Sequence, residues 1–196
     1  MSRILSLAVL ALSLCAAPAL AEPLPVMVSI APQKYFVEKL AGPLAEVSVM
    51  VTPGADAHTF EPKPGQMAQA ARARLYFAQG VEFEQVWLPR LAKTNKNMKV
   101  VDTLAGIELL PLAGDDDNGH GHGHKDKHVH EATTDPHTWT SPGLVKIQAA
   151  TMAKALAEAD PANAQAYAAN LAAFQAELDA LAGRLAAILE GVPAGS

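Results

Sequence analysis

Five of the seven histidines of the chain lie in one short polar run, DDDNGHGHGHKDKHVHE, at positions 115–131. Imidazole nitrogens suit zinc, copper or nickel better than manganese, which prefers oxygen ligands. The run is rich in glycine and charge, so we expect it to be disordered without metal. Its internal position and its acidic residues distinguish it from an expression tag. The five histidines are His120, His122, His124, His128 and His130.

The other two histidines lie in separate segments that contain proline. His58 is in TPGADAHTFEPKPG, three residues before Glu61, and His137 is in TTDPHTWTSPG. A histidine in a loop is more often a surface residue than a ligand, and Asp135 with His137 can serve simply to begin the next helix. If the two segments meet, however, His58 and His137 become candidate ligands of one metal ion.

The elements that must position these histidines follow from the pattern of apolar residues. Strands are predicted at 26–30, 47–51, 75–78 and 99–101, and helices between them at 33–40, 66–73 and 83–92. This alternation predicts an α/β fold in which a four-stranded parallel sheet has helices on both faces. Ligands bind beyond the carboxyl ends of such strands, where the loop with His58 begins. Another helix is predicted to start at Ser141-Pro142.

The first 21 residues have the pattern of a secretory signal peptide. Arg3 precedes an apolar run at 4–16, and Ala19-Leu20-Ala21 forms a cleavage site. The run is shorter than the roughly 20 residues that span a bilayer, so a membrane anchor is not expected. The pattern predicts a mature chain that begins at Glu22 in the periplasm.

The remaining composition narrows the class of ligand. The one cysteine, Cys15, lies in the signal peptide, so metal ligands in the mature chain must be histidine or carboxylate. Lipidation of Cys15 is an alternative that the large Leu14 before it disfavours. The formal net charge is -5, which argues against a nucleic-acid partner.

The order of these motifs resembles the periplasmic solute-binding proteins of zinc and manganese ABC importers. The resemblance rests on GADAHTFEPKPGQM, ARLYFAQGVEFEQVWLPRL, the histidine-rich insert and DPHTWTSP before a long helix, and it extends from Val26 to about Leu189. It implies that His58 and His137 are direct metal ligands and that Glu61 supports them. It also implies a membrane permease as partner, a monomer when complete, and Zn²⁺ rather than Mn²⁺, because the insert is typical of zinc members.

One departure from that family concerns its second lobe, which supplies a further histidine and a carboxylate. No histidine follows His137, and zinc needs about four ligands. We therefore expect an N-terminal fragment or the product of a shortened gene. The expected divisions are a signal peptide at 1–21, an α/β lobe at 22–141 with the insert at 114–134, a helical segment at 142–190, and the start of a second lobe at 191–196.

A long amphipathic helix at 161–189 supports that expectation. Apolar residues repeat at spacings of three and four from Ala164 to Ile188. At 1.5 Å per residue the helix is about 43 Å long, more than the roughly 30 Å width of a small domain. It should extend beyond its own lobe as a link between two lobes, or alternatively pack against another chain as a coiled coil.

Binding and delivery of zinc, without catalysis, is the function that these features favour. A metallohydrolase is disfavoured because no H-E-x-x-H or comparable signature is present. A periplasmic zinc buffer or chaperone that uses only the histidine-rich run is one alternative. A manganese-binding or adhesin-like relative is another.

Overall fold

The computed structural model of the chain describes residues 22–52, 54–55, 60–111 and 134–193. The predicted signal peptide, His58 and the five histidines of the run at 115–131 lie outside the described residues. Within the described part of the chain, no helix combines the length and apolar character needed to cross a bilayer.

Four parallel strands form the sheet, as the sequence predicts. They are β1 (Leu24–Val28), β2 (Ala45–Val49), β3 (Leu75–Ala78) and β4 (Lys99–Asp102). Their order across the sheet is β2-β1-β3-β4, and Val26 of β1 is opposite both Val47 and Leu75. The predicted α/β fold class is confirmed.

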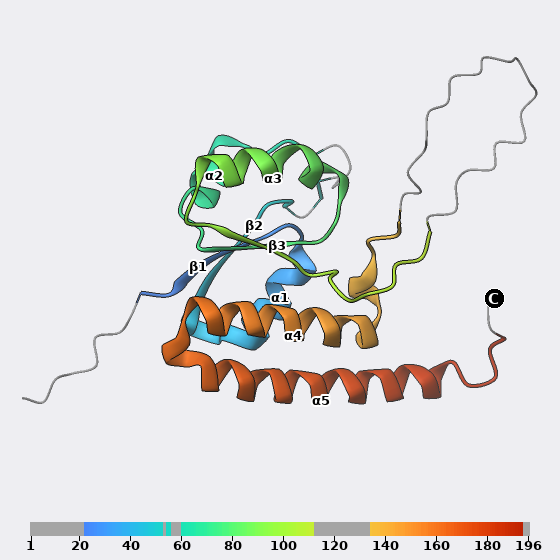
Figure 1. Cartoon of the computed structure of the whole chain (residues 1–196). Helices are drawn as coiled ribbons and strands as arrows, with labels where there is room; N and C mark the ends of the chain where they lie inside the picture. Colours follow the sequence, from blue (N-terminus) through green and yellow to red (C-terminus); the bar gives the residue numbers. More distant parts are fainter. Residues whose placement is uncertain (1–21, 53, 56–59, 112–133, 194–196) are drawn as a thin grey trace, which may run out of the picture.

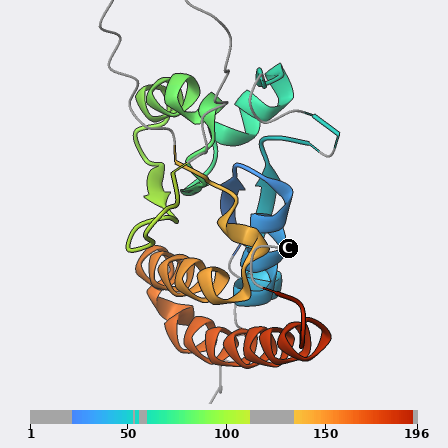
Figure 2. The same ribbon diagram turned by 90° about the vertical axis from the view of Figure 1, so that its right-hand side faces the viewer.

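Helices cover both faces of the sheet. Figure 1 shows α2 (Pro64–Ala70) and α3 (Glu82–Thr94) on one face, and α1 (Ala31–Ala41) and α4 (Pro142–Ala159) on the other. The fifth helix, α5 (Ala164–Ile188), lies outside α4 as an additional layer, which Figure 2 shows below α4 from a second direction. Helix α4 begins after the Ser141 N-cap with Pro142 in its first turn, as predicted.

The two faces of the sheet have separate hydrophobic cores because alternate strand residues point to opposite faces. Val26 and Val28 of β1 pack with α1, α4 and α5, around the buried Leu156 and Tyr167. Met27, between them, packs in the other core with residues from α2 and α3.

Helix α5 is long but starts later than predicted. The first three residues of the predicted helix, Pro161–Asn163, form a 3-10 turn instead. Asp160 accepts hydrogen bonds from Asn163 Nδ2 and Tyr167 OH, both at 2.7 Å, and this local pairing holds the turn. Tyr167, Leu171, Phe174 and Leu178 pack on the core, whereas Ile188 is 75% exposed. Figure 1 shows the end of α5 extending past α4.

Candidate metal site

The carboxyl ends of β1 and β3 lie side by side and mark the place where the topology predicts a ligand. The chain leaves β1 through α1 on one face and leaves β3 through α3 on the other. Divergent connections of this kind open a crevice beyond the strand ends. Polar residues follow three strands at this edge, namely Ser29, Gln79 and Thr103, and all three are fully buried.

His137 lies above this edge in the segment that leads into α4. Its Nδ1 is 2.6 Å from Asp135 Oδ1, and the same oxygen accepts a hydrogen bond of 2.9 Å from the backbone N–H of His137. That backbone hydrogen bond, together with the ring nitrogen, holds the pKa of Asp135 below its usual value. When Nδ1 donates to a carboxylate, the lone pair of Nε2 is free to bind a metal.

The surroundings of His137 leave its ring accessible. The side chain is 47% exposed, and its ring centroid is 4.9 Å from that of Trp139. A hollow of about 210 Å³ lies beside it, lined in part by Glu108, Asp135 and Leu144. Asp135 N donates to Leu110 O at 2.8 Å, which ties this segment to the chain after β4. The exposed ring and the contact of its Nδ1 with Asp135 are compatible with metal binding through Nε2.

The loop after β2, which contains His58, is anchored on both sides of that residue. Before it, Met50 O accepts a hydrogen bond from the side chain of Gln66, which follows the loop and also accepts from Lys63 N at 2.8 Å. After it, Phe60 packs edge-on against Phe83 of α3, with ring centroids 5.4 Å apart. Glu61 is exposed. Its predicted supporting role, like ligation by His58, remains a prediction.

A buried carboxylate holds the turn after β3. Glu84 of α3 accepts hydrogen bonds from Gln79 N at 2.7 Å and from Gly80 N at 2.8 Å. Burial raises the pKa of Glu84, and those hydrogen bonds oppose the shift only in part. Gly80 has φ of +80°, and a β-carbon there would lie 2.7 Å from Leu104 Cδ1, so this turn requires glycine.

Sequence analysis missed the residues beneath His137. Gln79, Thr103 and Gln148 form a buried hydrogen-bond network with Thr138, next to the histidine. The signal that would have found two of them is a polar residue directly after a strand, at 79 and 103. Gln148 gives no such signal, because it lies on a helix face and only the fold shows that this face is buried.

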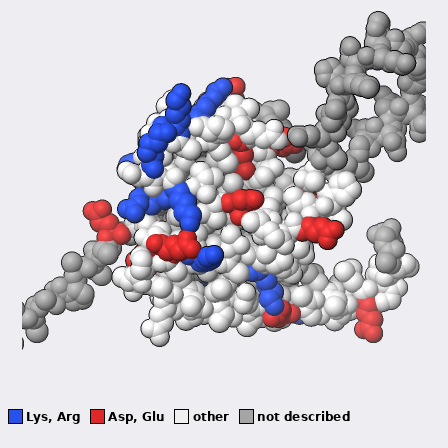
Figure 3. All heavy atoms as spheres, viewed as in Figure 1, with Lys and Arg blue, Asp and Glu red and all other residues white. Residues whose placement is uncertain are grey.

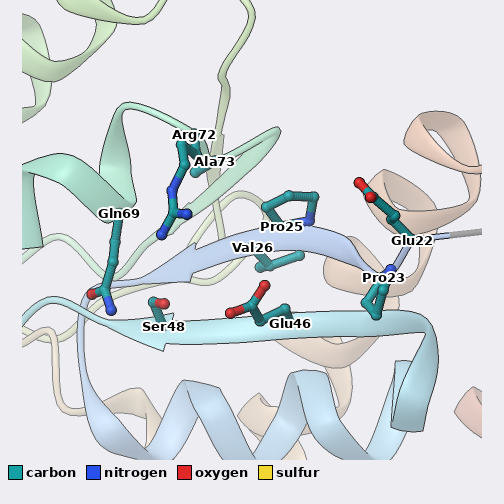
Figure 4. Close-up of a pocket in the computed structure, with 9 residues that line it drawn as sticks. All are labelled: Glu22, Pro23, Pro25, Val26, Glu46, Ser48, Gln69, Arg72 and Ala73. Atoms are coloured by element: carbon teal, nitrogen blue, oxygen red, sulfur yellow. The ribbon is translucent and has the colours of Figure 1, made fainter.

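The amino ends of the strands form a different kind of hollow. Figure 4 shows Gln69 and Arg72, at the end of α2, reaching toward β2, which contributes Glu46 and Ser48. The volume is about 280 Å³, and the described residues that line it include Glu22 but no histidine. Across the described part of the chain, no group of three or more His, Cys, Asp or Glu side chains is close enough to hold a metal ion.

Charge is distributed unevenly between the two ends of the strands. In Figure 3, Lys and Arg side chains gather at the left, where the strands begin. At the right, where the strands end and His137 lies, the charged side chains on this face are mainly Asp and Glu. This distribution favours the approach of a cation to the edge that carries His137.

The chain matches known proteins in both sequence and fold. Residues 26–196 match the sequence profile of the family described as zinc-uptake complex component A, periplasmic (ZnuA). The chain belongs to this family. A crystal structure of ZnuA is 44% identical in sequence and superposes with a TM-score of 0.75, over 87% of this chain and 60% of that one.

Two curated relatives of the ZnuA-family chain bind different metals according to their names. The iron-binding protein YfeA of Yersinia pestis is 29% identical over 65% of this chain and 37% of its own length. The zinc-binding lipoprotein AdcA of Streptococcus pneumoniae is also 29% identical, over 57% of this chain and 22% of its own length. The chain therefore spans less than half the length of both curated relatives.

Proposed function

We propose that the chain is the metal-binding lobe of the solute-binding component of a zinc ABC importer. In this proposal it captures Zn²⁺ in the periplasm and delivers it to a membrane permease, without a covalent step. His58 and His137 bind the ion directly. The observation that supports this most is the 2.6 Å contact between Asp135 and His137 Nδ1, which leaves Nε2 available beside an open hollow.

The chemistry of the ligands supports zinc as the cargo. Imidazole nitrogen is a common zinc ligand, and a carboxylate bound to the other ring nitrogen raises its basicity and fixes its orientation. Manganese prefers oxygen ligands, which makes a site built on two histidines less suited to it. Membership of a zinc-uptake family agrees with this choice.

Two histidines leave about two of the four usual zinc positions to other groups. In this proposal they come from a second lobe beyond the matched region, because the chain covers 60% of the solved ZnuA. The exposed end of α5 is the link toward that lobe. Separation of the lobes then removes ligands from the ion and releases it to the permease, with Glu61 supporting the loop of His58.

The histidine-rich run is an accessory in this proposal. His120, His122, His124, His128 and His130 collect zinc weakly and raise its local supply. A glycine-rich run loses conformational freedom when it wraps an ion, at roughly 1 to 2 kcal/mol per ordered residue, whereas His137 is already held by Asp135. Preorganisation therefore favours the site at the strand ends.

Chelator competition on three variants tests this division of roles. His58→Ala with His137→Ala should remove the tightest zinc site and keep the weak ones. Deletion of 115–131 should lower the number of ions bound and leave the tightest site nearly unchanged. His128→Ala is the matched single-histidine control and should not alter the tight site. Tight binding that survives the double substitution and disappears with the deletion would instead support a zinc buffer that uses the run.

A further inference from the structure

We infer that Gln79 and Gln148 are positioning residues for His137: a buried amide network sets the backbone on which the zinc ligand is presented. The inference rests on the proposed function, because it assigns the network a role at that site. Both glutamines are fully buried, and neither belongs to the ligand set proposed above.

Gln79 contacts the residues on both sides of His137. Its Nε2 donates to Pro136 O at 2.7 Å and to Thr138 Oγ1 at 2.9 Å. Both protons of one amide therefore go to the segment that carries His137. The backbone on either side of the histidine is fixed relative to the end of β3, where Gln79 lies.

Gln148 of α4 fixes the orientation of the Gln79 amide. Its Nε2 lies 3.0 Å from Gln79 Oε1, and it is also 3.1 Å from Thr138 Oγ1 and 3.3 Å from Thr103 Oγ1. Since a carbonyl oxygen only accepts, the donor at Gln148 makes the oxygen of Gln79 face α4. The amino group of Gln79 must then face Pro136.

The direction of these donors is set at the other end of the network. Gln33 Oε1 accepts from the backbone N–H groups of Ser29 at 3.0 Å and Ile30 at 3.4 Å, so Gln33 Nε2 faces Thr103, at 3.2 Å. Thr103 Oγ1 donates to Ala78 O at 2.6 Å and is left to accept from Gln33 and Gln148. One chain of hydrogen bonds thus runs from the end of β1 to the His137 segment.

One feature of the network distinguishes positioning from simple stabilisation. Gln148 Oε1 is a buried side-chain oxygen without a hydrogen-bond partner among the described residues. An unpaired buried acceptor lowers stability, and an apolar side chain of similar size would avoid it. The presence of Gln148 at this position is explained by its amino group, which donates to Gln79 and so orients the Gln79 amide.

The control is a buried amide at the opposite edge of the sheet. Asn95, after α3, donates through Nδ2 to Ala70 O at 3.0 Å and to Ala73 O at 2.8 Å. It is 8% exposed and resembles Gln79 in that one amide group holds a neighbouring segment. Asn95→Leu and Gln79→Met therefore remove similar hydrogen bonds at different distances from the proposed site.

The experiment measures zinc affinity by chelator competition, the absorption spectrum with Co²⁺ in place of zinc, and the Tm without metal. Gln79→Met should weaken zinc binding about tenfold and change the Co²⁺ spectrum, because ligand orientation changes. Asn95→Leu should lower the Tm and leave affinity and spectrum as in the unmodified protein. Thr138→Val, which removes the acceptor shared by both glutamines, provides the same test if Gln79→Met does not fold.

Two results would overturn the inference while the proposed function stands. One is unchanged affinity and spectrum in both Gln79→Met and Thr138→Val. The other is an equal loss of affinity in Asn95→Leu, which would make the effect one of general stability. His137→Ala is measured beside them, and retention of tight binding in that variant would overturn the proposed function and the inference together.

Discussion

The polar side chains at the two ends of the sheet differ in burial. Where the strands end, Gln79, Thr103 and Gln148 are fully buried and hydrogen-bonded to one another beneath His137. Where the strands begin, Arg72 and Glu46 line an open hollow (Figure 4). Both ends carry polar groups. Hydrogen bonds fix the members of the network beneath His137, whereas Arg72 and Glu46 in the hollow are exposed.

This difference indicates where the protein requires precise geometry. A buried amide loses its water and must keep its hydrogen bonds, so its position is determined by its neighbours. An exposed charge keeps its water and can move at little cost. A ligand for a metal ion needs a fixed position, and the linked network of fully buried side chains lies at the end that carries His137.

The largest effect that tests this difference is the response of zinc binding to pH. Protons compete with zinc for imidazole nitrogens, and histidine has a reference pKa of about 6.5. If two histidines bind the ion, zinc affinity should therefore fall by about 1000-fold between pH 7.5 and pH 5. Binding through carboxylate ligands alone would instead be lost nearer pH 4. Zinc titrations at several pH values decide between them, and a flat response down to pH 5 would exclude histidine ligands.

A smaller effect is expected when the partner of His137 is changed. Asp135→Asn keeps the shape of the side chain but removes its negative charge, which weakens the hydrogen bond to His137 Nδ1. Zinc affinity should therefore fall by about 10- to 100-fold. Glu46→Gln is the corresponding change at the opposite end and should leave the affinity unchanged. Chelator competition measures both, and equal losses in the two variants would contradict the assignment of the site to the strand ends.

The buried carboxylate under the site should give a change in stability that depends on pH. Burial raises the pKa of Glu84 in the folded protein, so the unfolded chain loses its proton first as pH rises. Stability from this group is therefore greatest below about pH 4.5, the ordinary value, and falls as pH rises toward the folded pKa.

Glu84→Gln isolates this contribution. At pH 4 the variant should be less stable by about 1 kcal/mol, since its amide group faces a backbone N–H that needs an acceptor. The difference should shrink as pH rises to 7, because only the unmodified protein loses stability. Urea unfolding at pH 4, 5, 6 and 7 measures this trend, and a difference that grows with pH would show that the folded pKa is not raised.

The smallest effect is expected at the exposed end. Arg72→Ala should change the free energy of unfolding by less than about 0.5 kcal/mol and leave zinc affinity unchanged, because the side chain is exposed. Unfolding and chelator competition on this variant provide the baseline for the other substitutions. A clear loss of affinity would show that both ends of the sheet contribute to binding.

Sequence patterns predicted the scaffold better than the site. Strand β3 has the predicted bounds, Leu75–Ala78, because a fully buried strand is a continuous apolar run. The turn at Pro161–Asn163 was missed because its cause is local, the pairing of Asp160 with Tyr167 and Asn163. Apolar periodicity does not record hydrogen bonds of this kind.

The metal site itself remains a prediction. His137 was named from the sequence as a candidate ligand, and the structure places it at the strand ends in direct contact with Asp135. Gln148 was not identified, because its partners are 69 residues away at Gln79 and 45 residues away at Thr103. A long-range network becomes visible only when the fold brings its members together.

The two halves of α5 should differ in how fast their backbone amides exchange hydrogen with solvent. The half that contains Tyr167 and Phe174 is packed on the lobe, so its amides open only with a large part of the domain. The half that contains Leu185 and Ile188 is exposed and is held in this chain mainly by the hydrogen bonds of the helix itself. Exchange should therefore quicken along the helix toward Ile188, and anything that covers its apolar side chains should slow exchange there first.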